Sequence, residues 1–217
     1  MSDRLASDYV EDYLERILSG DRRAALDLIH RIHSAGMPVI DLYEMVIGPA
    51  MHELGDLWYR NEISVAEEHV ATAVSELILV HCYDWLLEEI EPQFEGTAVL
   101  ACPGKEQHHL GLRMFADILE AMGLQTYYCG PRTPASEIPR LVRRVDADLV
   151  ALSVSMPTHL PVLNLTLSKL QRDAPDLPVL IGGRALSDRD NTLHRTKARF
   201  TRTLNAGMKL TRELLAG

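Results

Sequence analysis

The stretch TAVLACPGKEQHHLG, residues 97–111, decides the fold of this 217-residue chain. Its first six residues are apolar or small and predict a short buried strand, and a loop containing Pro103 and Gly104 follows. A helix is expected next, from about residue 109 to residue 122. A buried strand that leads through a loop into a helix is the opening unit of a parallel α/β sheet.

The same alternation continues along the rest of the chain. Further strands are expected at 124–129, 149–155 and 178–183, with helices at 134–145 and up to about 172 between them. Residues 187–202 predict a surface loop or short edge element, and 201–215 a closing helix. This pattern predicts a doubly wound parallel sheet of flavodoxin or Rossmann type, in which ligands bind at the carboxyl ends of the strands.

The first 92 residues have a different periodicity. Apolar residues recur there at helical spacing, which predicts two short helices broken at Ser19-Gly20 and longer ones at 39–58 and 64–90. Asp21 and Ser64 are the expected N-caps, and Glu67 completes a capping box with Ser64. The fold class is therefore α/β: a four-helix bundle (1–92) packed on a doubly wound α/β domain (93–217).

Composition excludes several classes of function. The chain has 22 Lys and Arg against 31 Asp and Glu, a formal net charge of −9, so a direct nucleic-acid partner is not expected. Its three cysteines form no paired motif, which favours reduced thiols in a cytoplasmic protein. No signal peptide is recognisable, and no apolar run approaches the roughly 18 residues that span a bilayer, so no membrane partner is expected.

The loop after the first predicted strand carries the chemistry, in the pattern Glu106-x-His108-x-x-Gly111. A histidine above strand ends offers a neutral nitrogen donor that suits a transition metal. Glu106 can accept the proton on the other imidazole nitrogen, which fixes the tautomer. Gly111 allows the backbone to approach a bulky ligand closely. This short pattern alone is equally typical of a loop histidine near an acid.

Two later motifs fall at the other strand ends. Forty-one residues separate Gly111 from Ser153-Val154-Ser155, and twenty-six separate Ser155 from Gly182-Gly183. With the histidine pattern, this spacing resembles the cobalamin-binding domain family over about residues 95 to 185. One departure is Ser155, where Leu or Thr is commoner.

The resemblance implies a role for each of these residues. In that family the nucleotide tail of cobalamin leaves the cobalt and enters the sheet, and the histidine takes the lower axial position. His108 would accordingly be the cobalt ligand and Glu106 its hydrogen-bond partner. The residues that would line the tail pocket or make room for the nucleotide are Ser153, Ser155, Gly182 and Gly183.

In the bundle, Trp58 is followed after nine residues by Glu68-His69. Taken separately, a tryptophan at a helix end suggests core, and a Glu-His pair in a first helical turn suggests a solvated helix end. Together they resemble the W-x9-EH motif of the B12-dependent photoreceptor family, whose bundle caps the upper corrin face. The resemblance implies that Trp58, Val65, Glu68 and His69 form a pocket for the upper ligand of adenosylcobalamin.

The photoreceptor resemblance implies a light-responsive regulator, not an enzyme, which acts as a homo-oligomer such as a dimer or through a protein partner. Known members often carry an N-terminal helix-turn-helix domain, and this sequence begins at the bundle, as expected of a stand-alone form. Tyr59 occupies the position where some relatives have a histidine that captures cobalt after photolysis, so His69 or water would take that place.

Other possibilities remain open. A corrinoid methyl carrier of a methyltransferase system pairs the same two domains, and a cobalamin-binding antirepressor of a transcription factor also fits. Some stand-alone photoreceptors are thought to hold a bilin as second chromophore. His30 and His33 share a helical face, but a polar or interfacial face explains them more simply than a metal or bilin site.

Overall fold

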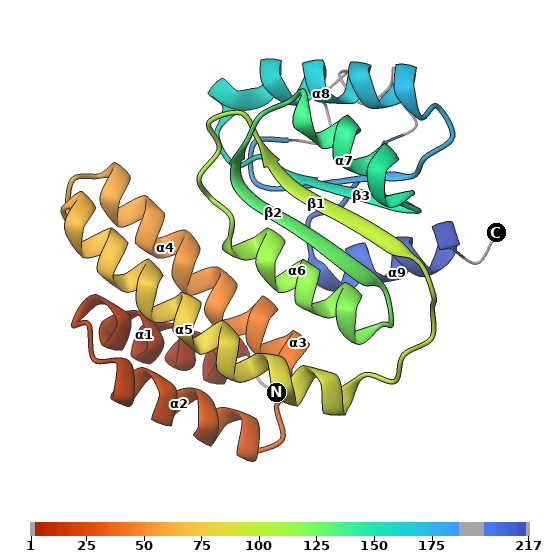
Figure 1. Ribbon diagram of the computed structural model, residues 1–217. Coiled ribbons are helices and arrows are strands. Elements are labelled where there is room, and N and C mark those ends of the chain that lie inside the picture. Colours follow the sequence, from red (N-terminus) through yellow and green to blue (C-terminus); the bar gives the residue numbers. More distant parts are fainter. Residues whose placement is uncertain (1–2, 187–197, 216–217) are drawn as a thin grey trace. The chain divides into compact units, whose positions relative to one another are not determined.

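The computed structural model describes residues 3–186 and 198–215, and the chain divides into two units, Met1–Ile90 and Glu91–Gly217. The first unit is helical and the second combines a parallel sheet with helices (Figure 1). The division falls two residues before the expected boundary at residue 92. The predicted fold class, a helical N-terminal unit followed by an α/β unit with a parallel sheet, is confirmed.

The helical unit forms where the sequence places its caps. Its elements are α1 (Asp3–Leu18), α2 (Arg22–Ser34), α3 (Val39–Leu42), the π-helical turn η1 (Tyr43–Ile47), α4 (Gly48–Tyr59) and α5 (Val65–Glu89). The Asp21 carboxylate accepts a hydrogen bond from the backbone N–H of Ala24 at 2.9 Å. Ser64 and Glu67 form a reciprocal capping box at the start of α5. These interactions satisfy helix-terminal N–H groups that have no partner within the helix.

The single helix expected at 39–58 contains a π turn. The backbone N–H of Gly48 donates to the carbonyl of Tyr43, five residues earlier. Pro49 has no N–H, and its ring would clash with the carbonyl of Met45 in an uninterrupted α-helix. The wider turn directly before Pro49 lets the helix continue, which helical periodicity alone does not predict.

The bundle core is apolar, with one buried hydrogen-bonded chain. The Tyr13 hydroxyl donates to Ser75 Oγ at 3.0 Å, and Ser75 lies 3.2 Å from the Met51 sulfur. Burial raises the pKa of Tyr13, more than the hydrogen bond to Ser75 lowers it, so the phenol stays a neutral donor. This chain joins α1, α4 and α5 inside the unit.

The expectation that no segment has the length and composition of a membrane span was wrong. Helix α5 has 25 residues and contains an 18-residue window of mean hydropathy 1.4. Its buried residues, which include Val74, Ile78 and Leu86, pack within the bundle. The core helix of a helical bundle can have the same length and hydropathy as a membrane-spanning helix, so the composition of α5 is weak evidence for a membrane span.

The second unit is a five-stranded parallel sheet in the order β2-β1-β3-β4-β5. Its strands are β1 (Thr97–Pro103), β2 (Gln125–Thr133), β3 (Leu149–Ser153), β4 (Val179–Gly182) and β5 (Arg199–Phe200). This is the flavodoxin-type order, with the chain reversing direction across the sheet at β1 and β3. The crevice that binds ligands in such sheets lies above the carboxyl ends of those two strands.

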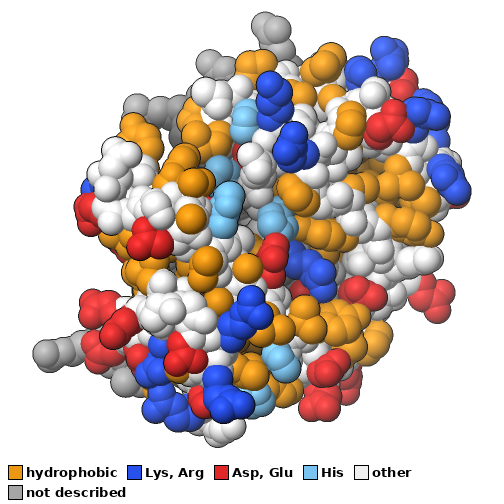
Figure 2. Space-filling model, turned by 60° about the vertical axis from the view of Figure 1, so that its left-hand side comes forward, with side chains coloured by type: hydrophobic (Ala, Val, Ile, Leu, Met, Phe, Trp, Pro, Cys, Tyr) orange, Lys and Arg blue, Asp and Glu red, His pale blue; other side chains and the backbone are white. Residues whose placement is uncertain are grey.

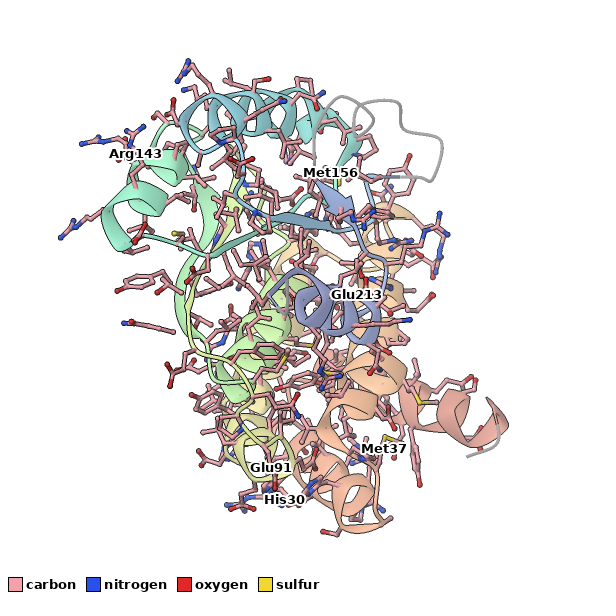
Figure 3. All side chains as sticks on the ribbon, turned by 90° about the vertical axis from the view of Figure 1, so that its right-hand side faces the viewer. His30, Met37, Glu91, Arg143, Met156 and Glu213 are labelled. Carbon is pink, nitrogen blue, oxygen red and sulfur yellow. The ribbon has the colours of Figure 1, made fainter. Side chains whose placement is uncertain are left out.

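Helices cover both faces of the sheet. Helices α7 (Glu137–Val145) and α8 (Leu160–Asp173) lie on one side, and α6 (Leu110–Ala121) and α9 (Leu204–Leu215) lie on the other (Figure 1). The turn η2 (Pro157–His159) precedes α8. Figure 3 shows Arg143 of α7 pointing outward and Met156 in the loop after β3. The core between the sheet and α7–α8 is built from branched and apolar side chains such as Val99, Val150 and Ile181.

Candidate functional site

Glu106 is the centre of the strand-end region, and its side chain is fully buried. Its Oε1 accepts hydrogen bonds from the backbone N–H groups of Gln107 and His108, at 3.0 and 2.9 Å. Its Oε2 accepts from the N–H groups of Ser155 and Met156, at 2.8 and 3.1 Å. One carboxylate therefore ties the loop after β1 to the loop after β3.

Two imidazoles contact the same carboxylate. His108 Nδ1 lies 2.5 Å from Oε1, and His159 Nδ1 lies 3.0 Å from Oε2. Burial raises the pKa of Glu106, but the hydrogen bonds from His108, His159 and the backbone together lower it well below its ordinary value. Glu106 is therefore a carboxylate anion at neutral pH that accepts hydrogen bonds from the donors around it.

This contact selects the tautomer of His108. A carboxylate at Nδ1 holds the proton on that nitrogen, so Nε2 carries the lone pair that suits a metal. The His108 side chain is 52% exposed, although its partner Glu106 is buried. The loop thus presents a basic, oriented imidazole at the sheet edge where the fold places ligands.

The sequence motifs assign no role to His159, and the structure places it in the site. His159 lies in η2, shortly after the carboxyl end of β3. Ligands of parallel sheets bind beyond the carboxyl ends of the strands, so this position is one where a site residue is expected. The usable signal was therefore topological: a histidine just beyond Ser153 and Ser155, facing the loop after the neighbouring strand. No local motif marks it, because 53 residues separate it from Glu106.

The small residues of the motif have separate structural roles. A Cβ at Gly111, in the first turn of α6, would have no neighbouring atom within 4 Å outside its own helix turn, so this position is open. Gly183 has φ +99°, and a Cβ there would lie 2.2 Å from the Val154 carbonyl oxygen. Gly183 therefore permits the close approach of the chain after β4 to the chain after β3.

Ser153 and Gly182 are paired neighbours at the ends of β3 and β4, and Ser153 is buried. Ser155 contributes its backbone N–H to Glu106. Cys102 lies beside the loop, with its sulfur 3.7 Å from the His108 carbonyl oxygen. Burial raises the pKa of the Cys102 thiol to about 12, so it is a neutral packing residue, not a competing thiolate ligand.

A corrin cofactor fits this set of residues. Within residues 3–186 and 198–215, no three His, Cys, Asp or Glu side chains could hold a metal ion together. The cobalt of a corrin brings four ring nitrogens of its own and needs only one further nitrogen from the protein, which His108 can supply. Gly111 adds no side chain at the start of α6, three residues after the imidazole.

The bundle residues of the predicted upper pocket gather where α4 ends and α5 begins. Trp58 is 41% exposed and His69 is 72% exposed, while Val65 and Tyr59 are also exposed. Glu68 is half-buried; it accepts a hydrogen bond from Thr72 Oγ1 at 2.9 Å and lies 3.6 Å from His69 Nε2. Trp58 is thus not a core residue, and this connection presents an indole and two polar side chains at the surface.

His30 and His33 pack against Trp85 of α5. The His33 ring stacks on the indole at 4.2 Å between centroids, His30 meets it edge-on at 4.7 Å, and His33 Nε2 lies 2.8 Å from a Glu89 oxygen. These contacts account for the shared face as an interhelical surface. Several histidine side chains also reach the face of the molecule shown in Figure 2.

A parallel sheet with an oriented imidazole–carboxylate pair at its strand ends, preceded by a helical unit, defines the class of corrinoid-binding proteins. Two family models, both described as B12 binding domains, match residues 9–83 and 96–199. The chain belongs to this B12-binding family and is a cobalamin-binding protein.

Curated relatives include two transcriptional repressors of Myxococcus xanthus. The chain is 28% identical over 185 residues to the HTH-type transcriptional repressor CarH, covering 83% of this chain and 60% of the relative. It is 29% identical over 158 residues to the HTH-type transcriptional repressor CarA, covering 72% and 53%. The chain therefore spans less than two thirds of the length of these relatives.

Solved structures share the fold at low identity. The monomethylamine corrinoid protein of Methanosarcina barkeri superimposes with a TM-score of 0.81 at 16% identity, covering 96% of this chain and 99% of that protein. A cobalamin-binding protein of Desulfitobacterium hafniense gives a TM-score of 0.51 at 20% identity, with 94% and 98% covered. These likenesses show the architecture alone.

Proposed function

We propose that this protein is a light-responsive regulator that uses adenosylcobalamin as its chromophore. The observation that carries the proposal is the pairing, in one chain, of the His108–Glu106 unit with the W-x9-EH motif at the α4–α5 connection. The similarity to two transcriptional repressors supports a regulatory role rather than an enzymatic one. We expect a cytoplasmic protein with no membrane partner and no direct contact with nucleic acid.

The lower face of the cofactor is assigned to the α/β unit. His108 would bind cobalt through Nε2, with Glu106 holding the ring by Nδ1. Ser153, Ser155, Gly182 and Gly183 would surround the nucleotide tail at the strand ends. His159 would keep the Glu106 carboxylate in place from the opposite side.

The upper face is assigned to the bundle. Trp58 and Val65 are exposed apolar side chains that would cover an upper ligand, and Glu68 and His69 would contact its polar groups. When bound, adenosylcobalamin supplies a cobalt–carbon bond that visible light breaks, while the protein supplies geometry. Loss of the upper ligand would remove the contacts of Trp58 and shift the bundle, altering a homo-oligomer, such as a dimer, or a protein contact.

A methyl carrier of a corrinoid methyltransferase system is the second candidate. The full-length likeness to the monomethylamine corrinoid protein favours it, but fold alone does not decide between functions. The W-x9-EH motif argues against a carrier, because a methyl carrier must open its upper face to partner active sites. A cobalamin-binding antirepressor of a transcription factor is a variant of the regulatory proposal that differs in its partner.

The test is reconstitution of the purified chain with adenosylcobalamin in the dark, followed by visible light. A regulator is expected to show a spectral change on illumination together with a changed hydrodynamic radius. The carrier role is tested separately, by loading the protein with methylcobalamin and measuring methyl transfer by a corrinoid methyltransferase. Methyl transfer without a light-dependent change in size would overturn the proposal. A bilin as second chromophore would appear as an additional absorption band in protein purified from its native cells.

A further inference from the structure

Helix α5 carries a second apolar face that points away from the bundle core. Its members are exposed and follow the heptad pattern of a helix-pairing seam. We call them the α5 stripe: Val70, Ala73, Leu77, Val80 and Leu87. The four larger side chains are between 36% and 57% exposed.

The stripe is separate from the core-facing side of α5, while His69 of the predicted upper pocket projects within about 20° of Val80, toward the same side. The buried residues of α5, such as Ala71, Ile78 and Cys82, lie on the opposite side of the helix. At 100° per residue, Glu68 also points about 180° away from Leu77 in projection, toward a different surface. A helix that is apolar on both faces is typically covered on both.

The charges of α5 restrict what can cover the stripe. This helix contains six acidic residues and no lysine or arginine. Glu76, Asp84 and Glu88 are exposed beside or within the stripe. Pairing with the same helix of a second copy would bring acidic side chains together, and an anionic membrane surface would be repelled. A partner helix with basic flanks complements both the apolar seam and its charge.

We propose that the α5 stripe docks an amphipathic helix of a partner protein, with apolar residues at heptad spacing flanked by Lys or Arg. The heptad spacing of the stripe fits a helix better than an extended peptide, because such seams pair helices by inserting the side chains of each into holes on the other. The inference goes beyond the proposed function and does not depend on cobalamin. The α5 stripe would be the surface through which the bundle binds another protein.

The probe is a fluorescein-labelled synthetic peptide of about 21 residues, three heptads of a Leu/Lys helix, with a Leu/Glu peptide of the same pattern as counterpart. Anisotropy titrations use the full chain, the double variant Leu77→Gln/Val80→Gln, and the control Leu165→Gln. Leu165 is 50% exposed on α8 of the other unit, which makes it a matched apolar surface residue.

The full chain and the Leu165→Gln variant are expected to bind the Leu/Lys peptide equally. The double variant should bind at least about tenfold more weakly, a loss of about 1.4 kcal/mol. Its melting temperature should match that of the wild type, since the replaced side chains are exposed. The Leu/Glu peptide should not bind.

Three results would overturn the inference. Equal binding by the double variant would show that the lysines contact other acidic surfaces. A concentration-dependent dimer that the double variant abolishes would identify a second copy as the occupant. Sedimentation with zwitterionic vesicles that depends on Leu77 and Val80 would identify a lipid surface instead.

Discussion

Glu106 and Trp58 belong to regions of very different order. The Glu106 carboxylate is fully buried, and six hydrogen-bond donors from two loops hold it. Trp58, in contrast, stands 41% exposed at the end of α4, among other exposed side chains. The hydrogen bonds around Glu106 therefore form within the α/β unit alone. The end of α4 and the start of α5 instead present exposed side chains with few described contacts, such as the one between Glu68 and Thr72.

The difference indicates a division of labour. If the proposed lower site binds cobalamin, its pre-organised carboxylate network should favour affinity and fix the ligand nitrogen, because little ordering is required on binding. An exposed upper surface can respond to the presence or absence of an upper ligand, since its contacts contribute little to folding. Mutations around Glu106 should therefore change the stability of the protein and its affinity for cobalamin. Mutations around Trp58 should change the response to the upper ligand.

The largest effect is expected from Glu106→Gln in the apo protein. The amide cannot accept all six hydrogen bonds, so buried donors lose partners and unfolding should become easier by on the order of 3 kcal/mol. Because folding lowers the pKa of Glu106, its stabilisation is present above the ordinary glutamate pKa of about 4.3 and is lost as pH falls below it. The gap between wild type and variant in urea unfolding should therefore shrink toward pH 3.

The matched control is Glu120→Gln, an exposed carboxylate of α6. It should change the free energy of unfolding by less than about 0.5 kcal/mol at neutral pH. Equal losses in the two variants would mean that the loop network around Glu106 does not stabilise the unit.

A smaller effect is expected from His159→Ala. Loss of this donor should loosen Glu106 and weaken hydroxocobalamin binding by about tenfold, as for other groups that support a metal ligand. The cobalt absorption spectrum should shift toward the form without a protein nitrogen ligand. His159→Gln, which keeps a donor, should restore most of the affinity; a wild-type spectrum and affinity in His159→Ala would exclude a positioning role.

Trp58→Ala tests the other region. Because the indole is half-exposed, the melting temperature should change by no more than about 2 °C. Affinity for adenosylcobalamin should fall while affinity for hydroxocobalamin stays the same, as measured by equilibrium dialysis in the dark. Tyr59→Ala, an exposed aromatic at the next position, is the control, and a parallel loss of affinity for both cobalamins would contradict the upper-ligand assignment.

The smallest effect concerns Asp117, a buried carboxylate of α6 that pairs with Arg113 at 2.9 Å. Burial raises its pKa to about 6, against the lowering by Arg113. A raised pKa means that Asp117 favours the folded state below pH about 4, and that this contribution is lost as pH rises through about 6. Asp117→Asn should therefore raise the melting temperature at pH 7.5 by a few degrees, and by less at pH 5.

The sequence predicted the features that depend on local spacing. The caps at Asp21 and Ser64, the strand–helix alternation and the contact of Glu106 with His108 all follow from residues within one or two turns of chain. The parallel-strand rule then placed the serine and glycine motifs at one edge of the sheet. The caps, the strand–helix alternation and the Glu106–His108 contact could be predicted because each depends on the backbone geometry of one short segment.

Contacts between distant segments could not be predicted in the same way. His159 reaches Glu106 across 53 residues, and only the adjacency of β1 and β3 brings them together. The exposure of Trp58 depends on how α4 and α5 meet, and a tryptophan at a helix end predicts burial more often than exposure. The extension of β2 to Thr133, four residues beyond the expected end, follows register shifts in its pairing with β1.

The most direct test of the account is electron paramagnetic resonance of the protein loaded with cobalt(II) cobalamin after labelling with ¹⁵N-histidine. If His108 binds the cobalt, the axial nitrogen splitting should change from three lines to two on labelling. The labelled splitting should vanish in His108→Ala and persist in the neighbouring control His109→Ala. An unchanged three-line pattern in the labelled wild type would show that the cofactor keeps its own base, and the assignment of His108 would be wrong.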